Sequence, residues 1–201
     1  VRDPARAADL ERAGCELWTG DVLRPDSLRG AGRGCDVAYY LVHSMGGASD
    51  FAARDREAAA TFQEAADRTP GLEQIVYLGG LGDEHDAALS PHLASRHEVG
   101  RVLAAGAVAV TELRAAVIIG SGSASFELIR ALVERLPIML TPRWVKGKAQ
   151  PIAIDDLLDY LMEALRIPTS SYRIYEVGGA DEVSYAEMMR AYGRQRGLKP
   201  L

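Results

Sequence analysis

The sequence predicts an α/β fold with a parallel sheet and crossover helices. From Cys15 onward, short apolar runs with β-forming residues alternate with longer stretches of helical periodicity. The apolar runs end in glycine or in a polar turn, as strands that feed functional loops do. With 201 residues, 48% of them hydrophobic, the chain can bury the core that this fold requires.

The first part of the chain supplies alternating helices and strands. Residues 50–68 are dense in Ala, Glu and Arg, which are strong helix formers, and Asp50 is expected to cap this helix. The other helices are expected over residues 4–13 and 91–105. The strands are expected over residues 16–19, 37–42, 74–78 and 110–119.

The pattern changes after Ile119. A Gly-Ser loop leads to an amphipathic helix over 124–135, and a proline-punctuated stretch over 137–151 indicates an insertion. Ser184 and Glu187 have capping-box spacing at the start of a last helix, and Asp155 or Asp156 is expected to cap the helix before it. The remaining elements are a strand over 150–154, a helix over 155–166, a strand over 172–177 and the last helix over 184–196.

Composition excludes several function classes. The net charge is −5 and the charges of both signs are interspersed, so no basic stripe predicts a nucleic-acid partner. No apolar run reaches the roughly 20 residues of a membrane helix, and no Cys or His cluster has metal-ligand spacing, so neither a membrane nor a metal is expected. Cys15 and Cys35 are expected to be reduced thiols, which predicts a cytoplasmic protein.

Several segments together resemble one family. The resemblance begins with Val-Arg-Asp-Pro at residues 1–4 and Gly-Asp-Val at 20–22. It continues over residues 39–45, 113–127, 141–145 and 150–156. In order and spacing these segments resemble atypical short-chain dehydrogenase/reductases, the group that includes NmrA-like and epimerase-like NAD(P)H-binding proteins.

The resemblance implies a Rossmann-type doubly wound sheet that binds a dinucleotide. It also implies that the sequence is truncated at its N-terminus, because the first strand and its glycine-rich phosphate loop have no counterpart here. Residues 120–125 lack the third glycine of such a loop and are expected near the substrate instead. The chain alone is therefore expected to bind dinucleotide poorly and to be less stable than a longer parent. Residues 1–122 are expected to form the partial cofactor domain, and residues 123–201 a substrate-side part.

The resemblance also implies which residues contact the cofactor. Arg2 would meet the 2′-phosphate of NADP, which favours NADP(H) over NAD(H), although Arg2 could equally be a solvated surface charge. Asp21 and Val22 would hold the adenine, or Asp21 would merely cap the helix that starts near Pro25. The other cofactor candidates follow two strands and are Leu41, His43, Gly79 and Gly80.

The catalytic residues of the family are replaced in this sequence. Standard members use a Tyr with a Lys four residues later, and this chain has His92 and Arg96 at the corresponding positions. His92 could transfer the proton while Arg96 holds the nicotinamide ribose, or His92 could be only an exposed residue near a helix start. Arg143 and Trp144 in the insertion are the substrate candidates, or they equally well only pack the insertion. His85 and His97 are expected at the surface.

Two functions remain open on these grounds. The first is an NAD(P)H-dependent oxidoreductase or epimerase-like enzyme that acts on a small organic substrate. The second is a non-catalytic module that senses NADP(H) and regulates a partner, and the missing Tyr and Lys favour it. A structural subunit with a bound nucleotide is a third, more distant option. The sequence does not determine an oligomeric state.

Overall fold

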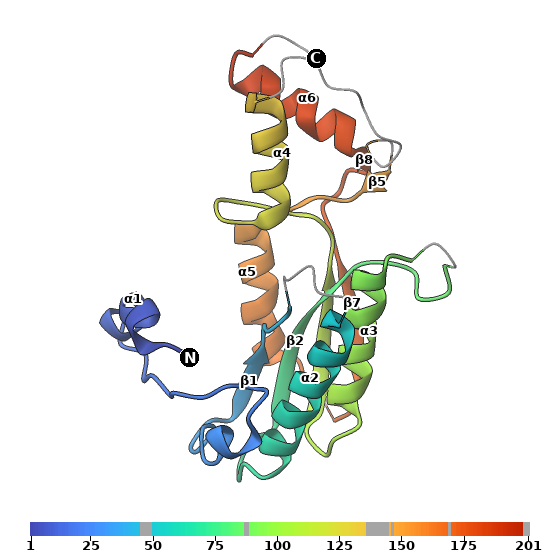
Figure 1. Cartoon of the computed structure of the whole chain (residues 1–201). Coiled ribbons are helices and arrows are strands. Elements are labelled where there is room, and N and C mark those ends of the chain that lie inside the picture. Colours follow the sequence, from blue (N-terminus) through green and yellow to red (C-terminus); the bar gives the residue numbers. More distant parts are fainter. Residues whose placement is uncertain (45–49, 87–88, 136–144, 146, 169, 199–201) are drawn as a thin grey trace. The chain divides into compact units, whose positions relative to one another are not determined.

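The computed structural model describes residues 1–44, 50–86, 89–135, 145, 147–168 and 170–198 (Figure 1). The chain forms two compact units. The first comprises Val1–Leu113 and Ile167–Tyr175, and the second comprises Arg114–Arg166 and Glu176–Leu201. The division into a cofactor part (1–122) and a substrate part (123–201) concerns function and stays a prediction.

A four-stranded sheet with the order β1-β2-β3-β7 organises the first unit. The strands are β1 Val37–Tyr40, β2 Gln74–Gly80, β3 Ala109–Ala115 and β7 Arg173–Val177. β1 and β2 run parallel, in a register that extends from Val37 opposite Gln74 to Tyr40 opposite Tyr77. Helices connect the strands, so the predicted α/β fold with a parallel sheet is confirmed.

Helices α2 (Phe51–Asp67) and α3 (Pro91–Ala104) lie side by side (Figure 1). Both match their predicted ranges closely. The Ser90 hydroxyl caps α3 by accepting a hydrogen bond from the Leu93 backbone N–H. Asp50 occupies the N-cap of α2 but makes no side-chain cap bond, which corrects its predicted role. Its backbone (φ −116°, ψ 16°) is not in the extended region from which a capping side chain reaches the first-turn amides.

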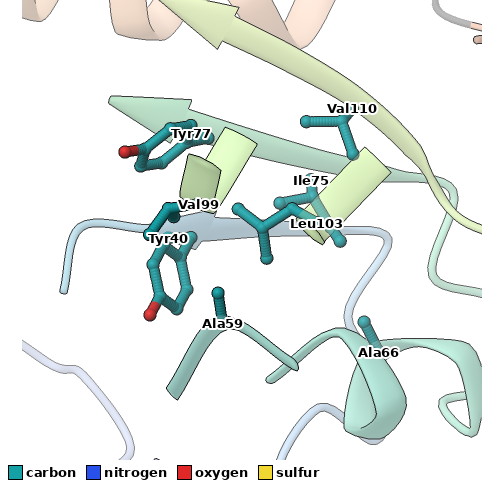
Figure 2. Close-up of a cluster of buried hydrophobic side chains, with 8 residues drawn as sticks. All are labelled: Tyr40, Ala59, Ala66, Ile75, Tyr77, Val99, Leu103 and Val110. Atoms are coloured by element: carbon teal, nitrogen blue, oxygen red, sulfur yellow. The ribbon is translucent and has the colours of Figure 1, made fainter. Parts of the chain in front are cut away.

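A hydrophobic core joins α2 and α3 to the sheet (Figure 2). The Tyr40 ring lies 4.9 Å from the Phe62 ring and 5.9 Å from the Tyr77 ring, centroid to centroid, in tilted geometry. Such burial of apolar side chains supplies most of the stabilisation of the unit. The buried members of this core are Tyr40, Ala59, Ala66, Ile75, Tyr77, Val99, Leu103 and Val110.

The predicted helix over 4–13 is confirmed as two consecutive short helices, η1 (Pro4–Ala7) and α1 (Ala8–Arg12). The predicted strand over 16–19 is wrong, because this run forms no strand. Among the described residues, its backbone hydrogen bonds run to Val1: the Val1 nitrogen donates to the Trp18 carbonyl, and the N–H of the following Gly20 donates to the Val1 carbonyl. A β-forming run becomes a strand only where a partner continues the ladder. The short helix η2 (Pro25–Leu28) follows.

The second unit packs helix α4 (Ala124–Arg135) against α6 (Tyr185–Gln195). A core with Ile129, Val133 and Met189 lies between them. The Ser184–Glu187 capping box of α6 is present as predicted. The other elements are α5 Ile154–Glu163, η4 Ala164–Arg166, β4 Ile118–Ile119 parallel to β6 Ile152–Ala153, and β5 Lys148–Ala149 antiparallel to β8 Val183–Ser184.

Three predictions for this unit need correction. The run over 110–119 is two strands, because the chain leaves the main sheet after β3 and β4 pairs with β6 instead. The strand predicted over 150–154 covers only Ile152 and Ala153, since Ile154 already begins α5. Neither Asp155 nor Asp156 caps α5: Ala153 is the N-cap, and the two carboxylates lie in the first turn, where the helix dipole favours negative charge.

Candidate functional site

The candidate site lies at the carboxyl ends of β1 and β2, both in the first unit. In a parallel α/β sheet this edge is where ligands bind. Leu41, Val42 and His43 follow β1 with exposed side chains. The Ser44 backbone N–H donates to the Asp55 carboxylate on α2 at 2.8 Å, so this segment is attached to a helix beyond the last ladder pair.

His43 lies in a mixed electrostatic environment. The imidazole is exposed on one side only, and its partial loss of water lowers its pKa; the Arg96 guanidinium lowers it further, whereas the Leu41 backbone and the Asp55 carboxylate raise it less. His43 and Arg96 come from different elements, so the fold brings a predicted cofactor residue close to a predicted catalytic residue.

A first testable prediction concerns this histidine. We expect the His43 pKa, measured by NMR titration, to lie below the ordinary value and to rise in Arg96→Gln, because a neighbouring cation is removed. In the folded chain His43 binds fewer protons than in the unfolded chain between its two pKa values. Its contribution to stability is therefore lost as the pH falls through that window. An unchanged His43 pKa in Arg96→Gln would contradict the electrostatic coupling.

Gly79 and Gly80 form the last two positions of β2 and are buried. A Cβ at Gly79 would lie 2.6 Å from Oε1 of Glu112, and a Cβ at Gly80 would lie 2.6 Å from Leu93 and 3.1 Å from Cδ of Arg96. Packing within the protein thus accounts for both glycines by itself. Their predicted contact with a cofactor stays a prediction.

The two predicted catalytic residues differ in their surroundings. His92 is exposed and its ring stacks on Phe51, the first residue of α2, with centroids 4.3 Å apart and an interplanar angle of 22°. Arg96 is half-buried, and the aliphatic part of its side chain packs beside Gly80. Arg96 is therefore the cation at this end of β2, whereas His92 lies at the outer surface of α3.

Tyr77 is a further phenol close to these residues. Its hydroxyl donates to the Arg96 backbone carbonyl at 2.9 Å. Burial raises the pKa of Tyr77, and the Arg96 charge lowers it less. A phenol with a raised pKa and a committed hydroxyl is poorly suited to proton transfer near neutral pH. Tyr77 thus does not replace the missing catalytic tyrosine.

His97 corrects a sequence-based prediction. It was expected at the surface, but its side chain is 1% exposed and its Nε2 lies 3.1 Å from the Gly80 carbonyl oxygen. Its Nδ1 is buried and has no hydrogen-bond partner among the residues that the structure describes. His97 lies one residue after Arg96 on α3 and turns toward β2, so it fixes the end of the strand from the helix side.

The N-terminal cofactor candidates form a second group. The Gly20 N–H donates a hydrogen bond to the Val1 carbonyl. This bond joins the residue before Arg2 to the residue before Asp21, so the two candidates lie in neighbouring segments. Arg2 is exposed. The Asp21 carboxylate accepts the Leu23 N–H at 3.0 Å in a local turn. Val22, within this turn, is half-buried. The carboxylate is thus engaged with its own backbone, and adenine binding stays a prediction.

The substrate side of the site is only partly defined. Arg143 and Trp144 lie outside the described residues. The loop before α4 is held by Ser123, whose hydroxyl donates to the Ile118 carbonyl at 2.6 Å. Gly122 in this loop has φ +82°, a conformation that favours glycine.

Sequence reasoning missed three buried polar residues near the β2 end. Asp55, Ser95 and Glu112 are 7%, 3% and 0% exposed. Each lies in a run that reads as ordinary helix or strand, and only the fold brings them together. A charged residue inside a strand, as Glu112 is in β3, is the signal that could have identified such a position.

The part of the chain that the structure describes holds neither of two other kinds of site. Within the described ranges, no group of three or more His, Cys, Asp or Glu side chains is arranged to hold a metal ion. None of the helices in the described part of the chain is long and apolar enough to cross a membrane.

Comparison of the fold with solved structures finds nucleotide-sugar enzymes. A double mutant of dTDP-glucose 4,6-dehydratase from Streptomyces venezuelae, with NAD bound, has a TM-score of 0.79 and 17% identity over 98% of this chain and 69% of its own. UDP-glucuronic acid 4-epimerase from Bacillus cereus has a TM-score of 0.75 and 15% identity over 96% of this chain and 70% of its own. UDP-glucose 4-epimerase from Thermus thermophilus, in complex with NAD, has a TM-score of 0.72 and 16% identity over 93% of this chain and 71% of its own. These likenesses establish the fold.

Comparison of the sequence establishes the family. No curated protein matches the chain in sequence. A family model described as NAD(P)H-binding matches residues 1–120, which include the candidate site at the ends of β1 and β2. The matched part is more than half of the chain, and the fold is that of the Rossmann-type epimerases and dehydratases. The chain therefore belongs to the NAD(P)H-binding family.

Proposed function

We propose that the chain binds NADP(H) at the carboxyl ends of β1 and β2 and acts as an oxidoreductase or epimerase-like enzyme on a small organic substrate. The observation that carries the proposal is the position of Arg96, whose Cδ lies beside Gly80 at the carboxyl end of β2. A guanidinium and an imidazole at this edge of the sheet offer hydrogen-bond donors, which suit the hydroxyls of a ribose. The residues present thus fit a dinucleotide.

In this proposal Arg96 orients the nicotinamide ribose, and Leu41, His43, Gly79 and Gly80 line the cofactor. The bound dinucleotide supplies the hydride chemistry. His92 exchanges a proton with the substrate, since imidazole titrates near neutral pH. Asp21 and Val22 contact the adenine, and Arg143 and Trp144 within residues 123–201 contact the substrate. The NAD-bound neighbours support a dinucleotide, whereas the preference for NADP(H) depends on Arg2.

A second candidate function is a non-catalytic NADP(H) sensor. The observation that favours it is that the Tyr77 hydroxyl and the His92 ring, two groups that could transfer protons, already contact other parts of the protein. The Tyr77 hydroxyl is bound to the Arg96 carbonyl, and the His92 ring is stacked on Phe51 at the surface. A sensor needs the cofactor residues but neither His92 nor a substrate.

Calorimetric titration with NADPH and NADH tests the cofactor. We expect Arg2→Ala to raise the NADPH dissociation constant about tenfold or more and to leave NADH binding unchanged, because a charged hydrogen bond to phosphate is worth about 1.5–3 kcal/mol. Arg6→Ala, which removes another exposed arginine of the same segment, is the control. Equal losses for both nucleotides would contradict the assignment of Arg2.

Turnover separates the two functions. With NADPH and a panel of small carbonyl compounds and nucleotide sugars, we expect His92→Ala to lower the rate about 100-fold or more while nucleotide affinity is kept. If the wild-type protein binds NADPH and turns over no member of the panel, the sensor is favoured. Because the chain alone is expected to bind dinucleotide weakly, the titration extends to high nucleotide concentrations, and absence of binding there for both nucleotides would overturn both candidates.

A further inference from the structure

Asp55 is a charged residue buried in the first unit, on the second turn of α2. Asp55 is only 7% exposed to solvent. Transfer of a carboxylate into such a place costs several kcal/mol unless hydrogen bonds compensate for the lost water. A buried acid in a helix of otherwise ordinary composition is therefore held there by specific partners.

The partners of Asp55 come from two other elements. Oδ1 accepts the backbone N–H of Ser44 at 2.8 Å, and Oδ2 accepts the hydroxyl of Ser95 on α3 at 3.2 Å. Ser95 is itself 3% exposed and precedes Arg96. One carboxylate thus connects the segment after β1, helix α2 and helix α3.

The segment after β1 needs such an anchor. The ladder between β1 and β2 ends with Tyr40 opposite Tyr77, so residues 41–44 extend beyond the regular sheet. Leu41, Val42 and His43 in this extension are exposed. The Ser44–Asp55 hydrogen bond closes this segment at its far end.

We infer that Asp55 is a positioning residue that fixes residues 41–44 against α2 and α3 in the conformation that receives the dinucleotide. The inference rests on the proposed cofactor site. Asp55 acts on the cofactor only through the Ser44 backbone and through Ser95 beside Arg96. The Asp55 charge also raises the pKa values of His43, Tyr40 and Tyr77, whereas the Arg96 charge lowers those of His43 and Tyr77.

The test combines amide hydrogen exchange with NADPH titration on the whole chain. In Asp55→Ala we expect the Ser44 amide to exchange about tenfold to 100-fold faster than in the wild-type protein, while the amides of β2 stay protected. The NADPH dissociation constant is expected to rise about tenfold. Glu57→Ala, which removes an exposed acid from the same helix, is the matched control and should change neither quantity.

Asp55→Asn keeps the test decisive if the alanine variant does not fold. The amide oxygen still accepts from Ser44 but carries no charge, so we expect Ser44 exchange to be about threefold to tenfold faster. An unchanged Ser44 exchange rate in Asp55→Asn and Asp55→Ala would overturn the inference. So would a released Ser44 amide with unchanged NADPH affinity. If the wild-type protein binds no dinucleotide, the proposed function fails, and the Ser44 exchange rate still decides whether Asp55 anchors the segment.

Discussion

Gly100→Ala is expected to lower the free energy of unfolding by about 3 kcal/mol or more, as overpacking of a rigid interior does. Gly100 lies in α3 and faces Glu112 of β3, which is 0% exposed. A Cβ at Gly100 would lie 2.9 Å from Cδ of Glu112 and 2.9 Å from the hydroxyl of Tyr172. The Glu112 carboxylate is fixed by the Tyr172 hydroxyl, so it cannot move aside freely.

Gly193→Ala is the matched control. Gly193 also lies within a helix, α6, but a Cβ there would meet only Cγ1 of Val133 at 3.6 Å, an ordinary van der Waals distance. Alanine is the better helix former by about 1 kcal/mol, so this variant should be neutral or slightly more stable. Urea unfolding measures both. In a double-mutant cycle with Glu112→Ala, Gly100→Ala should cost much less, and additive losses would contradict the steric explanation.

Leu103→Ala is expected to have a similarly large effect, a loss of about 3 kcal/mol. The side chain is 0% exposed, and Figure 2 shows it at the middle of the core cluster. Its truncation removes apolar burial and leaves a cavity that the packed neighbours cannot fill completely.

The control for Leu103 is Leu128→Ala in α4, where the side chain is 54% exposed. We expect this change to stay within about 0.5 kcal/mol, as surface substitutions usually do. Thermal or urea unfolding of both variants measures the difference. Equal losses at the two positions would mean that the cluster in Figure 2 does not dominate the stability of the first unit.

The helices were the elements that the sequence predicted well. The ranges of α2, α3, α4 and α6 follow from helical periodicity and from local signals such as the Ser184–Glu187 capping box. These signals lie within one segment, so they do not depend on how the rest of the chain packs. The strands β1, β2 and β7 were also found, because their apolar runs pair within the central sheet.

The failures concern partners that are distant in sequence. Residues 16–19 have strand composition but no ladder beyond Val1, and the run over 110–119 divides between two sheets. His97 follows Arg96 directly on α3. Whether this histidine faces solvent or the end of β2 depends on how the helix packs on the sheet, which the local sequence does not specify. Tertiary packing decides such cases.

The candidate site shows the same limit. The resemblance identified strand ends and two residues of α3, and the structure brings Arg96 to His43 and Gly80. It could not identify Asp55, since its partners Ser44 and Ser95 lie 11 and 40 residues away. Nothing local distinguishes this aspartate from the solvated acids elsewhere on the chain.

The chain passes between its two compact units three times, after Leu113, after Arg166 and after Tyr175. Neither unit is therefore one continuous stretch of sequence. A fragment that ends at Leu113 would leave Glu112 without Tyr172, whose hydroxyl it accepts. Replacement of the second unit by that of a relative would require three junctions at once, so the two units are expected to change together by single substitutions rather than by exchange of whole modules.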